Sequence, residues 1–219
     1  ISVGPERNQV IVTRDIFGKR PLPAVRVQIE LIRARLESFA DWQAGWIAKG
    51  WLIKKVEENV RDEQAPFLVD GEPMFLRGRI DRIDVHRESG QYVVIDYKTG
   101  DSAKKPDQTH RKQDEWIDLQ LPLYRYLLPA LEIENESVAL GYVVIPKDVS
   151  RTGERLADWT VDDLSSADET AKEVVRSIRR GEFGNMTLPP PAFFDEFAAI
   201  CQDNVFGMSL PETEGEDEA

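Results

Sequence analysis

Apolar residues recur at helical spacing between residues 23 and 49, and charged residues fill the positions between them. The apolar positions are Val27, Leu31, Ala34, Leu36, Phe39, Trp42 and Trp46. This pattern predicts one long amphipathic helix, or two helices in succession, packed on the core. Gly45 and Gly50 are candidate break points, and Gly50 is well placed as the glycine that follows a helix end.

The segment that follows has the shorter alternation of β-strands. The predicted strands cover residues 51–61, 67–69, 74–76, 75–85 and 92–99. Turn-forming residues at 70–73 and 88–90 join neighbouring strands in two hairpins. The pattern therefore predicts an antiparallel meander of three or more strands.

Longer elements return in the second half of the chain. They are a helix over residues 115–131, a strand over 138–145, an edge strand within 152–159, a helix from 162 or 163 to 180, and a short helix over 193–206. The run at 138–145 is apolar throughout, which is typical of a covered, central strand. The fold class expected is α/β, with a central mixed sheet that contains the meander, helices on both faces and the functional site at one edge.

Residues 101–114 interrupt this pattern because they contain almost no apolar side chains, and we expect them to form no core. Two interpretations stay open. The segment is a solvated loop, or its basic residues contact phosphates beside a functional site. The basic candidates for phosphate contact are Lys104, Lys105, Arg111 and Lys112.

The predicted hairpin around the turn at 88–90 carries the candidate chemistry. Asp81 lies on its first strand, and Asp96 and Lys98 lie near the end of the second. Side chains alternate along a strand, so Asp96 and Lys98 point to one face while Tyr97 points to the other. Carboxylate oxygens suit Mg²⁺ or Mn²⁺, and a nearby lysine can polarise water or neutralise charge on a phosphoryl group. A plain surface salt bridge is the alternative.

Three motifs occur in order: Gly78-Arg79-Ile80-Asp81, then Val94-Ile95-Asp96-Tyr97-Lys98-Thr99-Gly100, then Gln120 and Tyr124 four positions apart. The set resembles the PD-(D/E)XK nuclease superfamily. Within it, the chain looks like the nuclease domain of RecB and AddB helicase–nucleases. The resemblance covers roughly residues 26–145.

The resemblance implies roles for individual residues. Asp81 and Asp96 would be metal ligands, Lys98 the catalytic lysine, and the main-chain carbonyl of Tyr97 a further ligand. An additional acid is expected upstream, where Glu57 is preferred over Glu58. Gln120 and Tyr124 would position the substrate strand or the metal shell. Asp84 lies three residues from Asp81, so on a regular strand it faces the opposite side.

The resemblance also implies an activity. It is that of a Mg²⁺- or Mn²⁺-dependent deoxyribonuclease, an exonuclease acting on single-stranded DNA or duplex ends. A helicase domain or subunit in DNA repair or recombination would be its partner. The alternative is a nuclease-fold module that binds DNA or acts as a scaffold without catalysis.

The sequence departs from the family pattern in two ways. These nucleases usually carry a histidine on a helix well upstream of the glutamate strand, whereas His86 and His110 lie downstream of it here, which supports the non-catalytic alternative. Because the chain begins at Ile1 rather than Met, we expect an N-terminally truncated fragment; either it begins after this helix, or this member lacks the histidine. Some relatives also use four cysteines for an iron–sulfur cluster. The single cysteine, Cys201, excludes such a cluster within this chain.

Composition adds limits to this interpretation. Hydrophobic residues make up 41% and charged residues 31% of the 219 residues, which is typical of a soluble globular protein. No apolar run approaches the roughly 18 residues of a membrane span, and the lone cysteine fits a reducing, cytoplasmic setting. The net charge of −12 is unusual for a nucleic-acid binder. Acidic residues crowd the C-terminus, so we expect one domain over residues 1–206 and a disordered acidic tail over 207–219.

Overall fold

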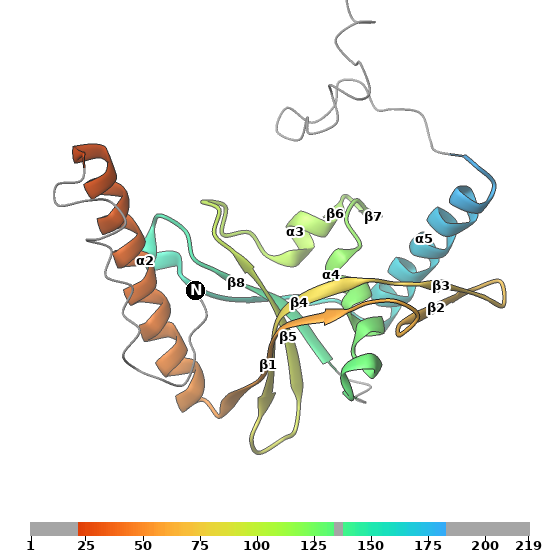
Figure 1. Cartoon of the computed structure of the whole chain (residues 1–219), viewed down its shortest axis with the longest axis horizontal. Helices are drawn as coiled ribbons and strands as arrows, with labels where there is room; N and C mark the ends of the chain where they lie inside the picture. The colour runs from red at the N-terminus through yellow and green to blue at the C-terminus, as the bar shows by residue number, and fades with distance from the viewer. Residues whose placement is uncertain (1–21, 134–137, 183–219) are drawn as a thin grey trace, which may run out of the picture. The chain divides into compact units, whose positions relative to one another are not determined.

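A computed structural model describes residues 22–133 and 138–182 (Figure 1). The chain divides into two compact units, Ile1–Arg176 and Ser177–Ala219. The described part of the second unit, residues 177–182, contains the end of a helix and the turn after it. The predicted helix over 193–206 and the predicted acidic tail over 207–219 lie outside the described residues.

A five-stranded mixed sheet forms the centre of the first unit (Figure 1). Its strands, in spatial order, are β1 (Trp51–Val60), β4 (Gly78–His86), β5 (Tyr92–Lys98), β8 (Val138–Val144) and β9 (Gly153–Leu156). The β1–β4, β4–β5 and β8–β9 pairs are antiparallel, and the β5–β8 pair is parallel. The predicted α/β fold, with a meander inside a mixed sheet, is therefore confirmed.

Helix α2 (Pro23–Ala48), in red to orange in Figure 1, packs on one face of this sheet through its second half. It is one uninterrupted helix, which decides between the two alternatives for this segment. Trp46 packs there against Val93, Ile95 and Val143. Gly50 follows the helix with φ +100°, and a Cβ at this position would lie 2.8 Å from the His86 ring. The predicted glycine stop is therefore required by both conformation and space.

Short elements cover the opposite face. They are α3 (Pro106–His110), the hairpin of β6 (Arg111–Lys112) and β7 (Glu115–Trp116), α4 (Gln120–Leu123), and the 3₁₀ helices η1 (Tyr124–Leu127) and η2 (Pro129–Leu131). A further 3₁₀ helix, η3 (Val149–Arg151), lies between β8 and β9 beside α2, where Ser38 donates to the Val149 carbonyl. Two predictions are wrong here. The predicted helix over 115–131 is broken, because residues 115–116 pair with β6 and Pro129 has no N–H to continue a helix. The stretch 101–114 does contribute to the core, since Pro106 and His110 are buried.

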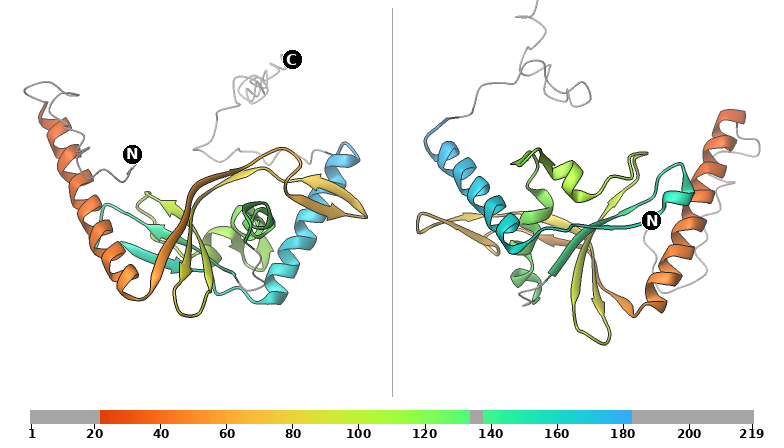
Figure 2. Two further views of the ribbon diagram at one scale, coloured as in Figure 1. Left: turned by 60° about the horizontal axis from the view of Figure 1, so that its bottom comes forward. Right: turned by 180° about the vertical axis from the view of Figure 1, so that it is seen from behind.

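The β2 (Pro66–Val69) and β3 (Glu72–Phe75) hairpin is a separate two-stranded sheet rather than part of the central one. It packs against α5 (Val161–Arg179), where Phe67 and Val69 meet Ala171 and Val175, as the views in Figure 2 show. Thr160 and Asp163 cap the start of α5 by bonding each other's main-chain N–H groups. None of the helices in the described part of the chain is long and apolar enough to span a bilayer.

Candidate active site

The end of β5 brings Asp96 and Lys98 to the face opposite α2, as alternation along the strand predicts. Asp96 is only 7% exposed. The Lys98 ammonium nitrogen lies 2.8 Å from Asp96 Oδ2, and the Lys98 side chain stays 41% exposed. Tyr97 points to the α2 face, where its hydroxyl accepts a hydrogen bond from Arg82 Nη1 at 3.2 Å. The site thus has a buried acid and a lysine that reaches solvent.

Asp81 joins this pair where β4 and β5 separate. The pairing of the two strands ends at Arg82 and Ile95. Beyond that point the Tyr97 N–H donates to Asp81 Oδ2 at 3.0 Å, so a side chain takes the place of a main-chain acceptor. This contact places the Asp81 carboxylate next to the Asp96 segment. The structure therefore brings Asp81, Asp96 and Lys98 together.

Asp96 has a shifted pKa. Burial raises it, the Lys98 ammonium opposes that effect, and the negative charge of Asp81 adds to it. Asp96 Oδ2 is buried, and within the described residues its partner is the Lys98 ammonium at 2.8 Å, with no further hydrogen bond. An acid that is buried, has a raised pKa and is paired only with a lysine that reaches solvent is a candidate functional group.

Gln120 and Tyr124 lie on the same side, as their spacing predicts, although Gln120 begins α4 and Tyr124 begins η1. The Gln120 Nε2 donates to the Tyr124 hydroxyl at 2.6 Å. Burial and the charge of Asp96 raise the pKa of Tyr124 to about 12. A Cβ on Gly78 would lie 2.9 Å from Leu127 Cδ1, so the glycine of the first motif lets η1 pack closely on β4.

Two residues that our sequence interpretation did not assign to the site border it. Tyr142 on β8 pairs with Asp96 in the parallel ladder and is 3% exposed. His110 is 1% exposed, and its ring lies 2.5 Å from the Tyr142 hydroxyl. Nothing in the local sequence marks either one. His110 sits in a polar stretch, Tyr142 sits in an apolar run, and a long-range parallel pairing brings them together.

The additional acid remains a prediction. The pairs on either side of Glu57, Val56–Arg82 and Glu58–Ile80, place Glu57 opposite Asp81 in register. Glu57 has a left-handed φ of 55°, and its carboxylate pairs with Arg79. Among residues 22–133 and 138–182, no group of three or more His, Cys, Asp or Glu side chains is placed to hold a metal.

Asp84 faces away from this site, as predicted. It is fully buried on the α2 side, where Arg82 donates to both of its oxygens, at 2.7 and 2.6 Å. The Trp46 indole N–H also donates to it, at 2.7 Å. Asp84 is therefore part of the attachment of α2 to the sheet and not of the carboxylate pair.

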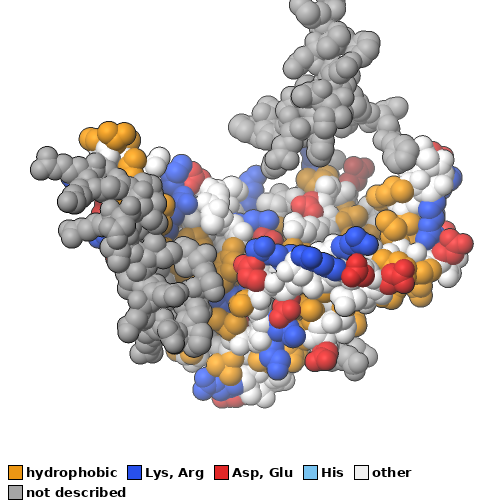
Figure 3. All heavy atoms as spheres, viewed as in Figure 1, with side chains coloured by type: hydrophobic (Ala, Val, Ile, Leu, Met, Phe, Trp, Pro, Cys, Tyr) orange, Lys and Arg blue, Asp and Glu red, His pale blue; other side chains and the backbone are white. Residues whose placement is uncertain are grey.

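The basic candidates occupy different environments. Lys105 pairs with Asp158 at 2.8 Å and Arg111 with Asp163 at 2.7 Å, while Lys104 and Lys112 are exposed. Figure 3 shows Lys and Arg side chains in a row across the middle of one face, with Asp and Glu beside them. The surface is thus of mixed charge rather than a continuous basic patch.

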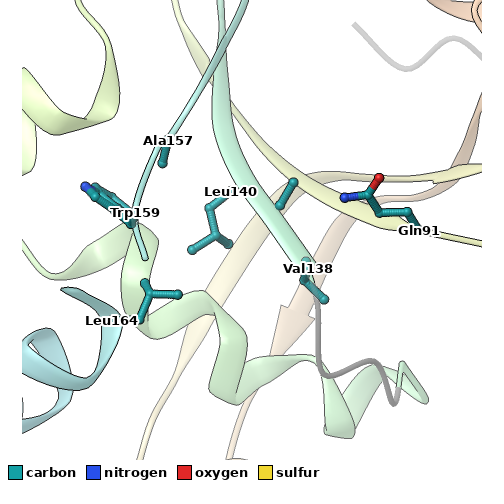
Figure 4. Close-up of a pocket in the computed structure, with 7 residues that line it drawn as sticks. Gln91, Val138, Leu140, Ala157, Trp159 and Leu164 are labelled. Carbon is teal, nitrogen blue, oxygen red and sulfur yellow. The ribbon is translucent and has the colours of Figure 1, made fainter. Parts of the chain in front are cut away.

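A pocket of about 200 Å³ lies near the start of β5 and β8 (Figure 4). Its lining residues are Gln91, Val138, Ala139, Leu140, Ala157, Trp159 and Leu164. None of these side chains titrates, and Asp96 and Lys98 lie at the other end of β5, about 15–20 Å along the strand. The pocket is therefore distinct from the carboxylate site.

A model of the PD-(D/E)XK nuclease superfamily matches residues 8–202 of the chain. The chain belongs to this superfamily. Among curated proteins, none matches it significantly. The superfamily match agrees with the geometry, because the Asp-x-Lys unit for which the superfamily is named corresponds to Asp96 and Lys98 at the end of β5.

Nucleases of this superfamily generally use divalent metals such as Mg²⁺, and the residues present fit such an ion. Mg²⁺ takes oxygen ligands, usually one or two protein carboxylates together with water and substrate phosphate. Asp81 and Asp96 supply two carboxylates, and the Tyr97 carbonyl lies on the main chain between Asp96 and Lys98. Asp96 Oδ2 has no hydrogen-bond donor within the described residues beyond the Lys98 ammonium at 2.8 Å, so the protein leaves it available to a cation.

Proposed function

We propose that this protein is a metal-dependent DNA nuclease domain that hydrolyses phosphodiester bonds, as an exonuclease on single-stranded DNA or duplex ends. The observation that carries the proposal is the buried Asp96 beside Asp81, with the Lys98 ammonium, 2.8 Å away, as the partner of its Oδ2 within the described residues. An ordinary surface salt bridge would not bury its carboxylate or raise the pKa of that acid.

In this proposal Asp81, Asp96 and the Tyr97 carbonyl hold Mg²⁺ or Mn²⁺. When bound, such an ion supplies Lewis-acid stabilisation of charge on the phosphoryl oxygens and lowers the pKa of bound water. The protein's part is to keep these oxygens oriented. The Tyr97 N–H holds Asp81 Oδ2, and burial keeps competing water away from Asp96.

Lys98 is the proposed catalytic lysine. Its ammonium group lies beside Asp96 and its side chain reaches solvent, so it can face both the carboxylates and an incoming phosphate. There it orients the attacking water and neutralises the charge that develops on the phosphoryl oxygens as the phosphorus–oxygen bond breaks. Gln120 and Tyr124 would position the substrate strand, with Lys104, Lys105, Arg111 and Lys112 as phosphate contacts.

Glu57 is the proposed additional acid. Its register opposite Asp81 favours it over Glu58, which lies one position further along β1. In the free protein its carboxylate is held by Arg79, so its use would require exchange of that ion pair for the metal.

A RecB/AddB-like relationship, with a helicase domain or subunit as partner in DNA repair or recombination, is part of the proposal. The order and spacing of the three sequence motifs support it. A cytoplasmic setting fits the single cysteine, and so does a site that works without an iron–sulfur cluster.

The direct test is cleavage of end-labelled single-stranded, duplex and closed circular DNA, with an RNA strand of the same sequence, in Mg²⁺, Mn²⁺ or chelator. We expect metal-dependent digestion of linear DNA from its ends and no cleavage of the circle. Asp96→Asn and Lys98→Met should each lower the rate at least about a hundredfold, as expected for groups that stabilise the transition state.

Matched controls come from exposed ion pairs elsewhere. Glu169→Gln and Lys172→Ala remove the carboxylate and the lysine of an exposed pair on α5, outside the carboxylate site, and both should cleave at the wild-type rate. Wild-type cleavage by Asp96→Asn and Lys98→Met would overturn the proposal. DNA binding without cleavage under any metal would instead favour the non-catalytic DNA-binding module.

A further inference from the structure

We propose that Tyr142 and His110 are positioning residues that hold the Lys98 ammonium against Asp96 without touching the substrate themselves. The inference rests on the proposed function, because it assigns a purpose to Lys98 that the proposal assumes. It goes beyond that proposal because it adds two residues, both outside the three sequence motifs, to the proposed active site.

The parallel pairing of β5 with β8 places the Tyr142 ring next to the Lys98 side chain. Asp96 pairs with Tyr142, and Lys98 lies two positions further on the same face. The Lys98 ammonium nitrogen is 5.0 Å from the centroid of the Tyr142 ring. At this distance the negative face of the ring attracts the cation. Lys98 therefore has two contacts, the Asp96 carboxylate and an aromatic face.

The orientation of the Tyr142 ring is set at its far end. Its hydroxyl lies 2.5 Å from His110 Nε2 and 3.0 Å from Thr109 Oγ1. With both bonds made, the buried hydroxyl is satisfied and rotation of the ring out of position would break them. The face that the ring presents to Lys98 therefore depends on α3, which supplies both partners.

His110 is itself held on both sides. Its Nδ1 lies 2.9 Å from the main-chain carbonyl of Asp118, and because a carbonyl only accepts, Nδ1 carries the proton. In the neutral ring Nε2 is then the acceptor, and the Tyr142 hydroxyl donates to it. The Trp159 ring packs edge-on against His110, 5.4 Å away between centroids. These contacts thus favour one tautomer of His110, with the proton on Nδ1, and one position of its ring.

A purely structural role does not account well for this chain of polar groups. Buried polar networks give little net stability over apolar side chains of similar volume. This one runs from the Asp118 carbonyl through His110 and Tyr142 and ends at Lys98, the group whose position matters for the proposed chemistry. We therefore assign it to positioning.

The test compares three variants. Tyr142→Phe keeps the ring and removes its hydroxyl, Tyr142→Leu removes the ring, and His110→Asn replaces the imidazole with a shorter side chain that ends short of the Nε2 position. The kcat for linear DNA with Mn²⁺ should fall about three- to tenfold in each, with Tyr142→Leu lowest, and KM should not change. Combining His110→Asn with Tyr142→Phe should cost no more than the larger single effect, because both act through one hydroxyl.

A second measurement does not depend on activity. Reductive methylation of Lys98, followed by mass spectrometry on protein free of metal and DNA, should be faster in Tyr142→Leu and His110→Asn than in wild type. Lys172, on α5, is the internal reference in the same samples. Tyr126→Phe is the matched control, since Tyr126 is a partly buried tyrosine of η1 whose ring packs against Phe67 on β2 rather than against Lys98.

Unchanged kcat and unchanged Lys98 methylation in the folded variants would overturn the inference, and so would a rise in KM with constant kcat. If Tyr142→Leu does not fold, the results for Tyr142→Phe and His110→Asn decide whether the inference stands. Wild-type cleavage by Lys98→Met would contradict the proposed function instead. In that case, or if no substrate is cleaved, the methylation rates alone decide whether the pair positions Lys98.

Discussion

The two faces of the β4–β5 hairpin each bury an aspartate, and they treat it in opposite ways. On the α2 face, both oxygens of Asp84 receive hydrogen bonds from Arg82, and Trp46 adds a third. On the other face, Asp96 Oδ2 has the Lys98 ammonium at 2.8 Å and no further hydrogen bond within the described residues. One buried acid is enclosed by several donors, and the other is left open apart from one lysine that reaches solvent.

This difference separates an acid that supports the fold from an acid that supports chemistry. A buried charge is tolerated when its partners satisfy it, and removal of one partner is then costly. An acid with an open oxygen gives up stability and leaves room for a cation or a proton. Tyr97 connects the two faces, because its hydroxyl bonds Arg82 while its N–H bonds Asp81.

The largest loss of stability is expected when Asp84 is replaced. Asp84→Ala leaves the Arg82 charge buried without its main partner, so we expect a loss of about 3–5 kcal/mol in the free energy of unfolding. Urea titration of the metal-free protein measures it. Replacing both residues, as Arg82→Met with Asp84→Leu, should recover most of the loss. A single variant within about 1 kcal/mol of wild type would contradict the closed network.

Asp96→Asn should behave in the opposite way. Burial raises the pKa of Asp96 above its usual 3.8, so the folded state binds more protons than the unfolded state in the range above that value. Stability of the metal-free wild type therefore falls as pH rises through this range, and at neutral pH the asparagine variant should be at least as stable. Mn²⁺ at a hundredfold excess over its Kd should stabilise only the wild type, by about 3 kcal/mol.

Thermal unfolding at several pH values, with and without Mn²⁺, checks this prediction. Asp84→Asn is the matched control on the other face, and it should lose stability without metal and still respond to Mn²⁺. A clear loss of metal-free stability in Asp96→Asn would mean that Asp96 is a structural acid like Asp84.

Two buried tyrosines, on the face of the sheet that carries Asp96, should make the free energy of unfolding depend on pH. Burial is the main cause that raises the pKa of Tyr124 and Tyr142 from 10.0 to about 12. The unfolded chain loses these protons near pH 10 and the folded protein near 12, so stability present below pH 10 is lost between the two values. The loss is at most about 3 kcal/mol for each tyrosine.

Urea titrations at pH 9 and pH 11, with tyrosinate absorbance recorded in parallel, measure that loss. Tyr142→Phe removes one of the titrating groups, so it should lose less stability than wild type between the two values. Equal losses in both proteins would contradict the assignment of Tyr142 to a buried, neutral state.

The smallest effect on stability is expected at Arg79, which forms an ion pair with Glu57. Arg79→Gln should change the free energy of unfolding by less than about 1 kcal/mol, because the pair is exposed. It should also tighten Mn²⁺ binding, since it frees the proposed additional acid. Calorimetry should also compare Mn²⁺ binding by Glu57→Gln and Glu58→Gln, because only Glu57→Gln should lower the affinity for Mn²⁺. Equal behaviour of the two glutamate variants would remove Glu57 from the site.

Local sequence patterns predicted much of this arrangement. Strand alternation correctly placed Asp96 and Lys98 on one face, Tyr97 on the other, and Asp84 away from Asp81. Register along a strand is a local property with a period of two, so it can be read directly from the chain. The glycine stop at Gly50 is similarly local.

The failed predictions have physical causes. The apolar stripe over residues 115–131 was interpreted as one helix, but its first residues pair with β6 in a hairpin and Pro129 has no N–H to continue a helix near its end. The polar stretch 101–114 was expected to lie outside the core, yet α3 buries His110 because Tyr142 and the Asp118 carbonyl satisfy both of its ring nitrogens. Composition alone does not reveal such partners.

By itself the sequence determined the strands, the faces of Asp81, Asp96 and Lys98, and the family motifs that they form. Only the tertiary structure decided which residues surround them. The parallel pairing of β5 with β8 brings Tyr142 under Lys98, and the fold of residues 106–118 brings His110 to Tyr142. Alternation follows from backbone geometry within one strand, whereas these neighbours depend on contacts between segments more than 30 positions apart, which no local pattern encodes.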